Sequence, residues 1–531
     1  MMGVDARIPV PEEFFESQKI DHLGVTNNEG LWSQRYYTYG KHFQGPGHPI
    51  FLILGGEGGI SPETGIMYPF VGDHLAKTFG GYVLQPEHRF YGKSRPISGR
   101  MAVGSSTPTT YNGEDPRVNL FTSEQALHDA MTLLEHVRKD LGCSSSRDDP
   151  SAYCPVITVG GSYPGFLSAF ARIMFPEVVD MAYAASAPMN FYAQQTGAFA
   201  YYDHITDVAE ETMSGCATGV KWSLMEVQRI IMKSQTVLEL ESVASKVGIC
   251  KGTIPDYILS TDGSFQTKMA HELMMVVGYT FANDSMANYP PGKDTRLFKA
   301  CEIFTHKNIS PTEKVKTLLT ERLHLYGGSG KQRYPPHTDG DDDSSSSSPP
   351  PKCWKMTQQL PTGPNATISG GDWSGVGTGP DGESWDFQTC TLLVEAIGFS
   401  KDSMFPARDW TLEWLQEHCM ARFGVRPRPN ELVNRFGFND LVSNNITNIL
   451  FTNGLKDGWS VSGIQTNLSD SLIALNFQNG AHHSDLNPLG PSPRDSDDIQ
   501  EGYKFIARLL GKWLGEVCNN LGDRNAISST E

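Results

Sequence analysis

The stretch VITVGGSYPG, residues 156–165, decides the fold. Its apolar residues 156–159 run into two glycines, which is typical of a buried strand that enters a tight turn. The apolar run that follows predicts a helix over 166–175. Ser162 therefore lies between a strand and a helix, where a serine hydroxyl can be exposed as a nucleophile. The match to Gly-X-Ser-X-Gly is imperfect, because Pro164 replaces the second glycine, but proline is tolerated in the first turn of a helix. An ordinary glycine-rich turn is the alternative.

Apolar strands and helices alternate on both sides of this turn. Strands are predicted at 49–54, 82–84, 156–159, 181–184, 446–451 and 472–477, and helices at 122–141, 166–175 and 499–514. This alternation predicts an α/β fold, with a mostly parallel sheet covered by helices on both faces.

The pattern changes between about residues 205 and 325, where only helices are predicted: 208–213, 224–234, 237–247 and 266–281. We therefore expect an α/β domain made of residues 1–200 and 430–531, split by a helical insertion, 201–429. The acidic, serine- and proline-rich segment near 337–351 predicts a disordered loop within that insertion.

Composition excludes several classes of protein. The chain has 531 residues, of which 39% are hydrophobic, and this supplies a sizeable core. Its net charge of -17 disfavours a nucleic-acid partner. No run reaches the roughly 18–20 apolar residues of a membrane helix. No cysteine or histidine cluster has zinc spacing, so we expect neither a metal nor a cofactor.

A serine nucleophile needs a base and an orienting acid, which in α/β hydrolases follow it in the order acid, then histidine. Asp457 comes shortly after the predicted strand 446–451, and His482 and His483 come shortly after the strand 472–477. Three such residues in this order, each behind a strand, predict a serine hydrolase. The residues alone do not choose between the two histidines.

The oxyanion of such a reaction needs two backbone N–H groups. One is expected from Tyr163, the residue after the nucleophile, and the other from the glycine loop 55–59, at Glu57 or Gly58. This loop lacks the Lys-Ser/Thr ending of a phosphate-binding loop.

Many segments in order then resemble one family. They are WSQRYY (32–37), GEG (56–58), EHRFYGKS (87–94), TSEQAL (122–127), GGSY (160–163), WDFQTC (385–390), GVRPRP (424–429), DGWS (457–460) and GAHHSDL (480–486). The chain is similar over nearly its whole length to the serine exopeptidases that comprise lysosomal Pro-Xaa carboxypeptidase, dipeptidyl peptidase II and thymus-specific serine protease.

The resemblance implies an α/β-hydrolase core with the insertion as a helical cap, and cleavage of peptides beside proline without a cofactor. It assigns the base to His482, the first of the pair, and places Trp459, Phe166 and His483 at the substrate pocket. The lead hypothesis is a carboxypeptidase that cleaves a proline-X bond near the C-terminus. A dipeptidyl aminopeptidase that releases X-Pro dipeptides and a catalytically silent binding homologue are the alternatives, and a homodimer is left open.

The resemblance also implies disulfides and a cellular location. The implied pairs are Cys216–Cys301, Cys250–Cys353 and Cys390–Cys419, with Cys143 and Cys154 as a local pair and Cys518 left over. Acceptor sequons for glycosylation occur at Asn283, Asn308, Asn365, Asn445 and Asn467. Together these features favour a lysosomal or secreted protein, although residues 1–7 are not followed by an apolar signal core.

Three positions depart from the family pattern. Pro164 replaces a glycine at the nucleophile turn. Asn487 replaces an arginine that has been a candidate for binding a substrate carboxylate. Glu395 occupies a position that is often apolar in the substrate pocket, and this bears directly on the preference for proline.

Overall fold

An eight-stranded sheet forms the centre of the computed structural model, which describes residues 8–26, 28–97, 115–149, 151–254, 258–259, 264–322, 353–354, 356 and 380–528. The strands are β1 (Glu13–Lys19), β2 (Leu31–Tyr39), β3 (Ile50–Ile53), β4 (Tyr82–Pro86), β5 (Val156–Gly161), β6 (Met181–Ala185), β7 (Ile449–Gly454) and β8 (Leu472–Phe477). Their order is β1-β2-β4-β3-β5-β6-β7-β8. All pairs from β4 to β8 are parallel, so the predicted α/β-hydrolase fold is confirmed.

The two strands at the start of the sheet were not predicted from the sequence. β1 pairs with β2, and β2 with β4, in antiparallel register. β1 lies at the edge of the sheet and alternates between partly buried and exposed residues, so it lacks the continuous apolar run that marks the central strands.

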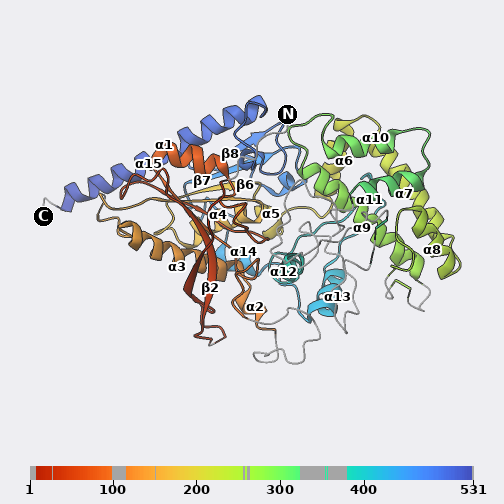
Figure 1. Ribbon diagram of the computed structural model, residues 1–531, viewed down its shortest axis with the longest axis horizontal. Helices are drawn as coiled ribbons and strands as arrows, with labels where there is room; N and C mark the ends of the chain where they lie inside the picture. The colour runs from red at the N-terminus through yellow and green to blue at the C-terminus, as the bar shows by residue number, and fades with distance from the viewer. Residues whose placement is uncertain are drawn as a thin grey trace.

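The two faces of the sheet carry separate parts of the core, because alternate residues of a strand point to opposite sides. Ile50 and Leu52 pack with α3 (Ser123–Leu141) and α4 (Tyr163–Met174). Phe51 and Ile53 pack on the other face with α15 (Asp497–Ser528). Figure 1 shows α3 and α15 on opposite sides of the strands.

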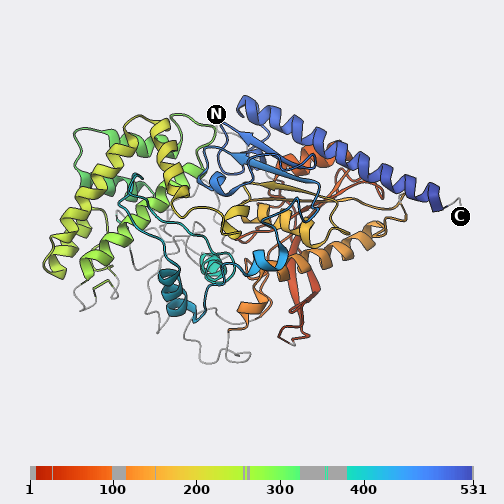
Figure 2. The ribbon, with the colours of Figure 1, turned by 180° about the vertical axis from the view of Figure 1, so that it is seen from behind.

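The described regular elements between β6 and β7 are all helices. They are α5 (Met189–Tyr192), α6 (Ala200–Thr212), α7 (Cys216–Met232), α8 (Val237–Lys246), α9 (Phe265–Met286), α10 (Arg296–Thr305), α11 (Pro311–Glu321), α12 (Pro380–Thr389), α13 (Leu412–Phe423) and α14 (Glu431–Phe436). Helices α6 to α11 gather beside the sheet, at the end of the molecule away from the C-terminus, in both Figure 1 and Figure 2. The division into domains at residues 200 and 430 stays a prediction, and the loop near 337–351 lies outside the described residues.

Several predicted elements begin or end elsewhere in the structure. The helix expected at 166–175 begins at Tyr163, directly after the candidate nucleophile. The helix expected at 208–213 is much longer and begins at Ala200. The strand expected at 446–451 is also shifted, because β7 begins at Ile449 and ends at Gly454, whereas β8 has the predicted bounds. These differences lie at element ends, where sequence periodicity carries least information.

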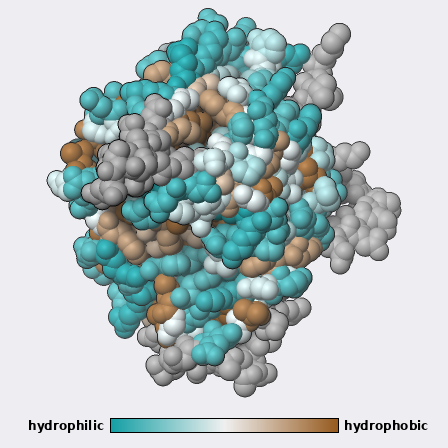
Figure 3. Space-filling model, turned by 90° about the vertical axis from the view of Figure 1, so that its left-hand side faces the viewer, coloured by the Kyte–Doolittle hydropathy of each residue, from teal (hydrophilic) through white to brown (hydrophobic). Residues whose placement is uncertain are grey.

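No described helix is both long and apolar enough to cross a membrane. The face in Figure 3 is mostly hydrophilic, with apolar residues scattered between the hydrophilic ones.

Candidate active site

The turn after β5 holds Ser162 in a strained conformation. Ser162 has φ 68° and ψ -132°, a region that non-glycine residues rarely adopt. Its N–H donates to the carbonyl of Ala185 at 2.9 Å, and its own carbonyl accepts the N–H of Phe166 at 3.1 Å, which starts α4. A side chain at Gly160 would collide with the backbone of Pro164. The sequence therefore supplies a glycine where the sharp turn leaves no room for a Cβ.

Pro164 fits this turn without breaking it. It lies in the first turn of α4, where a backbone N–H would have no partner within the helix. Its ring packs against Gly56, where an added Cβ would collide with the ring carbons of the proline. The proline thus fills the space between the helix start and the glycine loop after β3.

Asp457 and His482 are joined at the ends of two neighbouring strands. Asp457 is fully buried three residues after β7, and its Oδ1 accepts the N–H of Trp459 at 3.1 Å. Its Oδ2 lies 2.5 Å from Nδ1 of His482. A carboxylate accepts, so Nδ1 carries the proton and Nε2 is left as the basic nitrogen of the neutral ring. The structure thus pairs the acid with His482 rather than with His483.

His483 lies under the nucleophile turn. A Cβ added at Gly161 would be 2.8 Å from Cγ of His483, so the imidazole packs directly against the residue before Ser162. The rings of His482 and His483 are 4.6 Å apart, centre to centre. Burial, and to a smaller degree the neighbouring His482, lowers the pKa of His483 to about 3. This partly buried ring packs against the turn, and its place at the substrate pocket stays a prediction.

The candidate nucleophile and base lie on the same end of the sheet without being hydrogen-bonded to each other. Ser162 follows β5, Asp457 follows β7 and His482 follows β8, and the carboxyl ends of parallel strands share one edge. Both Ser162 and His482 are described, and the structure records no hydrogen bond between them. Such bonds are often long before a substrate is bound.

The glycine loop lies next to the start of α4. Gly56 packs on Pro164, and a Cβ added at Gly55 would lie 2.5 Å from the carbonyl oxygen of Pro86. The contact between Gly56 and Pro164 brings the loop that contains Glu57 and Gly58 next to the N-terminal end of α4, where the N–H of Tyr163 lies. An oxyanion needs donors from both of these segments.

The two aromatic residues expected at the substrate pocket differ in their surroundings. Trp459 is 9% exposed, and its ring lies 6.4 Å from His482 and 4.9 Å from Tyr201. Phe166 has no exposed surface and packs 4.8 Å from the ring of Tyr192. In this structure Trp459 therefore borders the candidate site, whereas Phe166 is a core residue beneath it.

A polar cluster around the Tyr163 hydroxyl is the feature that sequence reasoning missed. The hydroxyl lies 3.1 Å from Nε2 of His88, 3.0 Å from Oγ of Ser123 and 3.2 Å from Nε2 of Gln388. Burial lowers the pKa of His88 to about 4, so its ring is neutral at neutral pH. His88 Nδ1 donates to the carbonyl of Arg89, so Nε2 accepts from the tyrosine. The three partners come from three of the segments that resemble the family, 87–94, 122–127 and 385–390, so those matches were the only indication of the cluster in the sequence.

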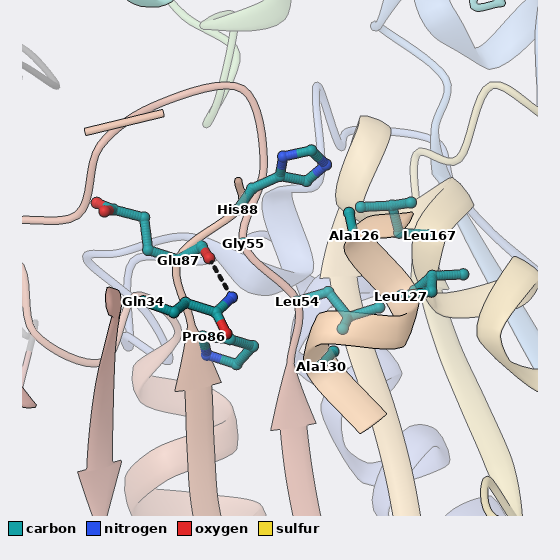
Figure 4. Close-up of a pocket in the computed structure, with 10 residues that line it drawn as sticks. All are labelled: Gln34, Leu54, Gly55, Pro86, Glu87, His88, Ala126, Leu127, Ala130 and Leu167. Atoms are coloured by element: carbon teal, nitrogen blue, oxygen red, sulfur yellow. Dashed lines mark hydrogen bonds between the residues drawn. The ribbon is translucent and has the colours of Figure 1, made fainter. Parts of the chain in front are cut away.

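A cavity next to this cluster is separate from the candidate nucleophile. It lies between the ends of β3 and β4 and helices α3 and α4 (Figure 4). Its lining comprises Gln34, Leu54, Gly55, Pro86, Glu87, His88, Ala126, Leu127, Ala130 and Leu167. On one side of it, Gln34 Nε2 donates to the carbonyl of Glu87 at 2.8 Å. Since neither Ser162 nor His482 lines it, we assign no substrate to this cavity.

Metal binding is not supported at the one residue group with suitable spacing among the described residues. Asp386, Cys390 and His418 lie close together. However, Cys390 is bonded to Cys419, and Asp386 is paired with Arg422 at 2.5 Å. A disulfide sulfur and a carboxylate that already neutralises an arginine are poor ligands.

The other cysteines and the sequons are placed as follows. The structure also pairs Cys143 with Cys154, Cys216 with Cys301 and Cys250 with Cys353, while Cys518 is free and exposed. Among the sequons, Asn308, Asn445 and Asn467 are exposed, and Asn283 lies within α9, where its Nδ2 donates to the carbonyl of Tyr279. Asn365 lies outside the described residues.

Comparison with known proteins gives the family. Residues 18–506 match the family described as serine carboxypeptidase S28. This chain belongs to that family. The S28 chain is therefore a serine-type peptidase.

Relatives of this S28 chain share about a quarter of its residues along nearly its full length. Lysosomal Pro-X carboxypeptidase of Mus musculus is 27% identical over 524 residues, covering 96% of this chain and 90% of the relative. The protein of the same name from Homo sapiens is 27% identical over 516 residues, covering 96% and 89%. Thymus-specific serine protease of Mus musculus is 26% identical over 525 residues, covering 96% and 88%.

Proposed function

We propose that this S28 peptidase is an exopeptidase with Ser162 as nucleophile, His482 as general base and Asp457 as the group that orients the base. The observation that carries the proposal is the 2.5 Å contact between Asp457 and His482 Nδ1, at the same sheet edge as the strained turn of Ser162. Neither feature has a structural purpose that requires the other. Serine hydrolysis requires an acid–histidine pair and an exposed serine at the same edge of the sheet.

The mechanism follows from these positions. His482 Nε2 takes the proton of Ser162 Oγ as the oxygen attacks the peptide carbonyl, and Asp457 stabilises the imidazolium that forms. The N–H of Tyr163 and the loop at Glu57 and Gly58 stabilise the negative oxygen. The imidazolium then gives its proton to the leaving amine. Water attacks the acyl-enzyme by the same route in reverse and restores Ser162.

The substrate we propose is a peptide with proline before the scissile bond near its C-terminus. The names of the relatives, lysosomal Pro-X carboxypeptidase, support this choice. The position of Trp459 beside His482 supports it too, because proline rings pack well on aromatic faces. Release of X-Pro dipeptides from a free N-terminus is the runner-up on the same scaffold.

We also propose that helices α6 to α13 act as a cap over this site, and that the protein works in the lysosome or outside the cell. The cap proposal is supported by α6, which contacts the segment Gly458–Ser462 directly after Asp457. The location is supported by the lysosomal relatives and by four disulfides, which persist in oxidising compartments.

The test uses the whole protein at mildly acidic pH. One peptide ends in Pro-Phe and has a blocked N-terminus, and a second substrate carries a free amine and an X-Pro reporter. A fluorophosphonate probe reports the activated serine independently of the substrate. Release of Phe supports the carboxypeptidase, and release of the reporter supports the runner-up.

Ser162→Ala is the decisive variant, and Ser151→Ala, at an exposed serine, is its matched control. We expect Ser162→Ala to lose labelling and about a thousandfold or more of the activity, with an unchanged melting temperature. Ser151→Ala should retain both. Equal activity in the Ser162→Ala protein would overturn the proposal.

A further inference from the structure

The last turn of α9 is hydrogen-bonded to the two loops that carry the proposed acid and base. Met286 is the last residue of α9, and its carbonyl accepts the backbone N–H of His482 at 3.2 Å. The hydroxyl of Ser285 is buried and donates at 2.8 Å to the carbonyl of Lys456, the residue before Asp457. One end of this helix is therefore attached to the acid loop and to the base loop at the same time.

The side chain of Met286 reaches the aromatic residue that borders the site. The indole N–H of Trp459 donates to Sδ of Met286 at 3.2 Å. An indole N–H can only donate, and a thioether sulfur is a polarisable acceptor that suits it. The rings of Tyr201 and Phe191 pack on Trp459 with centres 4.9 and 5.8 Å away. The bond to sulfur adds a directional contact, which ring packing alone lacks.

These bonds close into a ring of four residues. Asp457 accepts the N–H of Trp459 through Oδ1 and contacts Nδ1 of His482 through Oδ2. Trp459 is bonded to Met286, and Met286 is bonded to His482. Three members of this ring follow the last two strands, and Met286 comes from a helix between β6 and β7. Because moving one member strains two bonds, the ring fixes the aromatic face relative to the base.

The proposed reaction depends on this spacing. The residue before the scissile bond packs on Trp459 while His482 takes the proton of Ser162, so the position of the indole sets the distance from the peptide carbonyl to the base. A proline ring is rigid and cannot adapt to an indole that has turned. An alanine methyl covers less of the indole and depends less on its orientation.

We propose that Met286 is a positioning residue for the subsite that receives the residue before the scissile bond. Its sulfur holds the indole of Trp459 and its carbonyl holds His482, so helix α9 takes part in the preference for proline. The proposal rests on the function proposed for Ser162. It applies to the carboxypeptidase and to the runner-up alike, since proline precedes the scissile bond in both.

Two variants at Met286 and one control separate the sulfur contact from general packing. Met286→Leu removes the acceptor and keeps the apolar volume and the backbone carbonyl. Met286→Gln offers an acceptor again on a side chain of similar length. Met275→Leu makes the same exchange at another partly buried methionine of α9, about three turns earlier.

Each protein is assayed with two N-blocked peptides, which differ only in Pro or Ala before the C-terminal Phe. A pair of free-amine X-Pro and X-Ala reporters covers the runner-up in the same way. The rate of fluorophosphonate labelling reports Ser162 and His482 without use of the subsite, and thermal unfolding shows that each variant is folded.

We expect Met286→Leu to lower kcat/KM for the proline substrate by about 2- to 10-fold and to change the alanine substrate little. The proline-to-alanine ratio falls by the same factor, which a mere loss of folded protein would not cause. Met286→Gln should restore part of this ratio. Met275→Leu should leave it unchanged, and labelling should keep its wild-type rate in all variants.

An unchanged ratio in Met286→Leu, or a ratio in Met286→Gln as low as in Met286→Leu, would contradict the role of the sulfur. An equal fall of the ratio in Met275→Leu would contradict it too. A wild-type protein that neither cleaves any of the four substrates nor reacts with the fluorophosphonate would instead refute the function proposed for Ser162.

Discussion

The proposed catalytic residues lie at positions that short sequence patterns mark, whereas the hydrogen bonds around the Tyr163 hydroxyl join residues that are far apart in the chain. Ser162, Asp457 and His482 each come within five residues of the end of a strand. The Tyr163 hydroxyl, by contrast, is bonded to Gln388, which is 225 residues away in the chain. The chemistry is thus placed by local strand-end geometry, while its support comes from contacts that only the folded chain creates.

The largest expected effect comes from substituting the two adjacent histidines, His482 and His483. We expect His482→Gln to lower kcat by about a thousandfold or more, because it removes the group that takes the serine proton. His483→Gln should cost far less activity and should mainly lower stability, since that ring packs against Gly161. Steady-state kinetics and thermal unfolding of both variants provide the measurement. If His483→Gln lowered kcat more than His482→Gln, His483 and not His482 would be the general base.

A smaller effect is expected from the long-range support. Tyr163→Phe keeps the ring and the backbone N–H but leaves His88, Ser123 and Gln388 without their shared partner. Buried polar groups that lose a partner cost about 1–3 kcal/mol of folding free energy. We expect that loss in urea unfolding, with a fall in kcat of less than about tenfold, because the proposed oxyanion donor remains. Phe170→Leu, a substitution in the core on the same helix, controls for general loosening of α4. A loss of kcat with no loss of stability would mean that the Tyr163 hydroxyl takes part in the reaction rather than in supporting the fold.

The sequence predicted the parallel strands and the strand–turn–helix at Ser162, because these depend on short apolar runs and on glycine. It also predicted an acid and a histidine at later strand ends. It did not predict β1 and β2, because their mixed polar and apolar residues lack the continuous apolar run that marks the central strands. It could not tell that Phe166 is fully buried or that His88 contacts Tyr163, because burial and partner choice depend on residues far away in the chain.

The smallest expected effect concerns the pair that joins α12 to α13, and it depends on pH. His418 Nε2 lies 3.2 Å from both oxygens of Asp386, which also binds Arg422. Burial, and to a smaller degree the charge of Arg422, lower the pKa of His418. The charge and hydrogen bond of Asp386, with a smaller contribution from Glu272, raise it by more, so the pKa lies above the ordinary 6.5. The pKa of Asp386 is lowered, so its carboxylate stays charged in mild acid.

A raised histidine pKa contributes stability that is complete below the unfolded value and is lost as the pH rises through the folded value. His418→Gln should therefore destabilise the protein more at about pH 5 than at about pH 9, with a difference of about 1 kcal/mol or less. Thermal unfolding at the two pH values measures this difference, and His136→Gln, at an exposed histidine of α3, is the control. Gln388, which binds the Tyr163 hydroxyl, also lies in α12. If His418→Gln loses kcat together with stability, in the same pH range, the ion pair acts on the Tyr163 hydroxyl through this helix. A penalty that is equal at both pH values would mean that His418 acts through packing on Trp414 rather than through its charge.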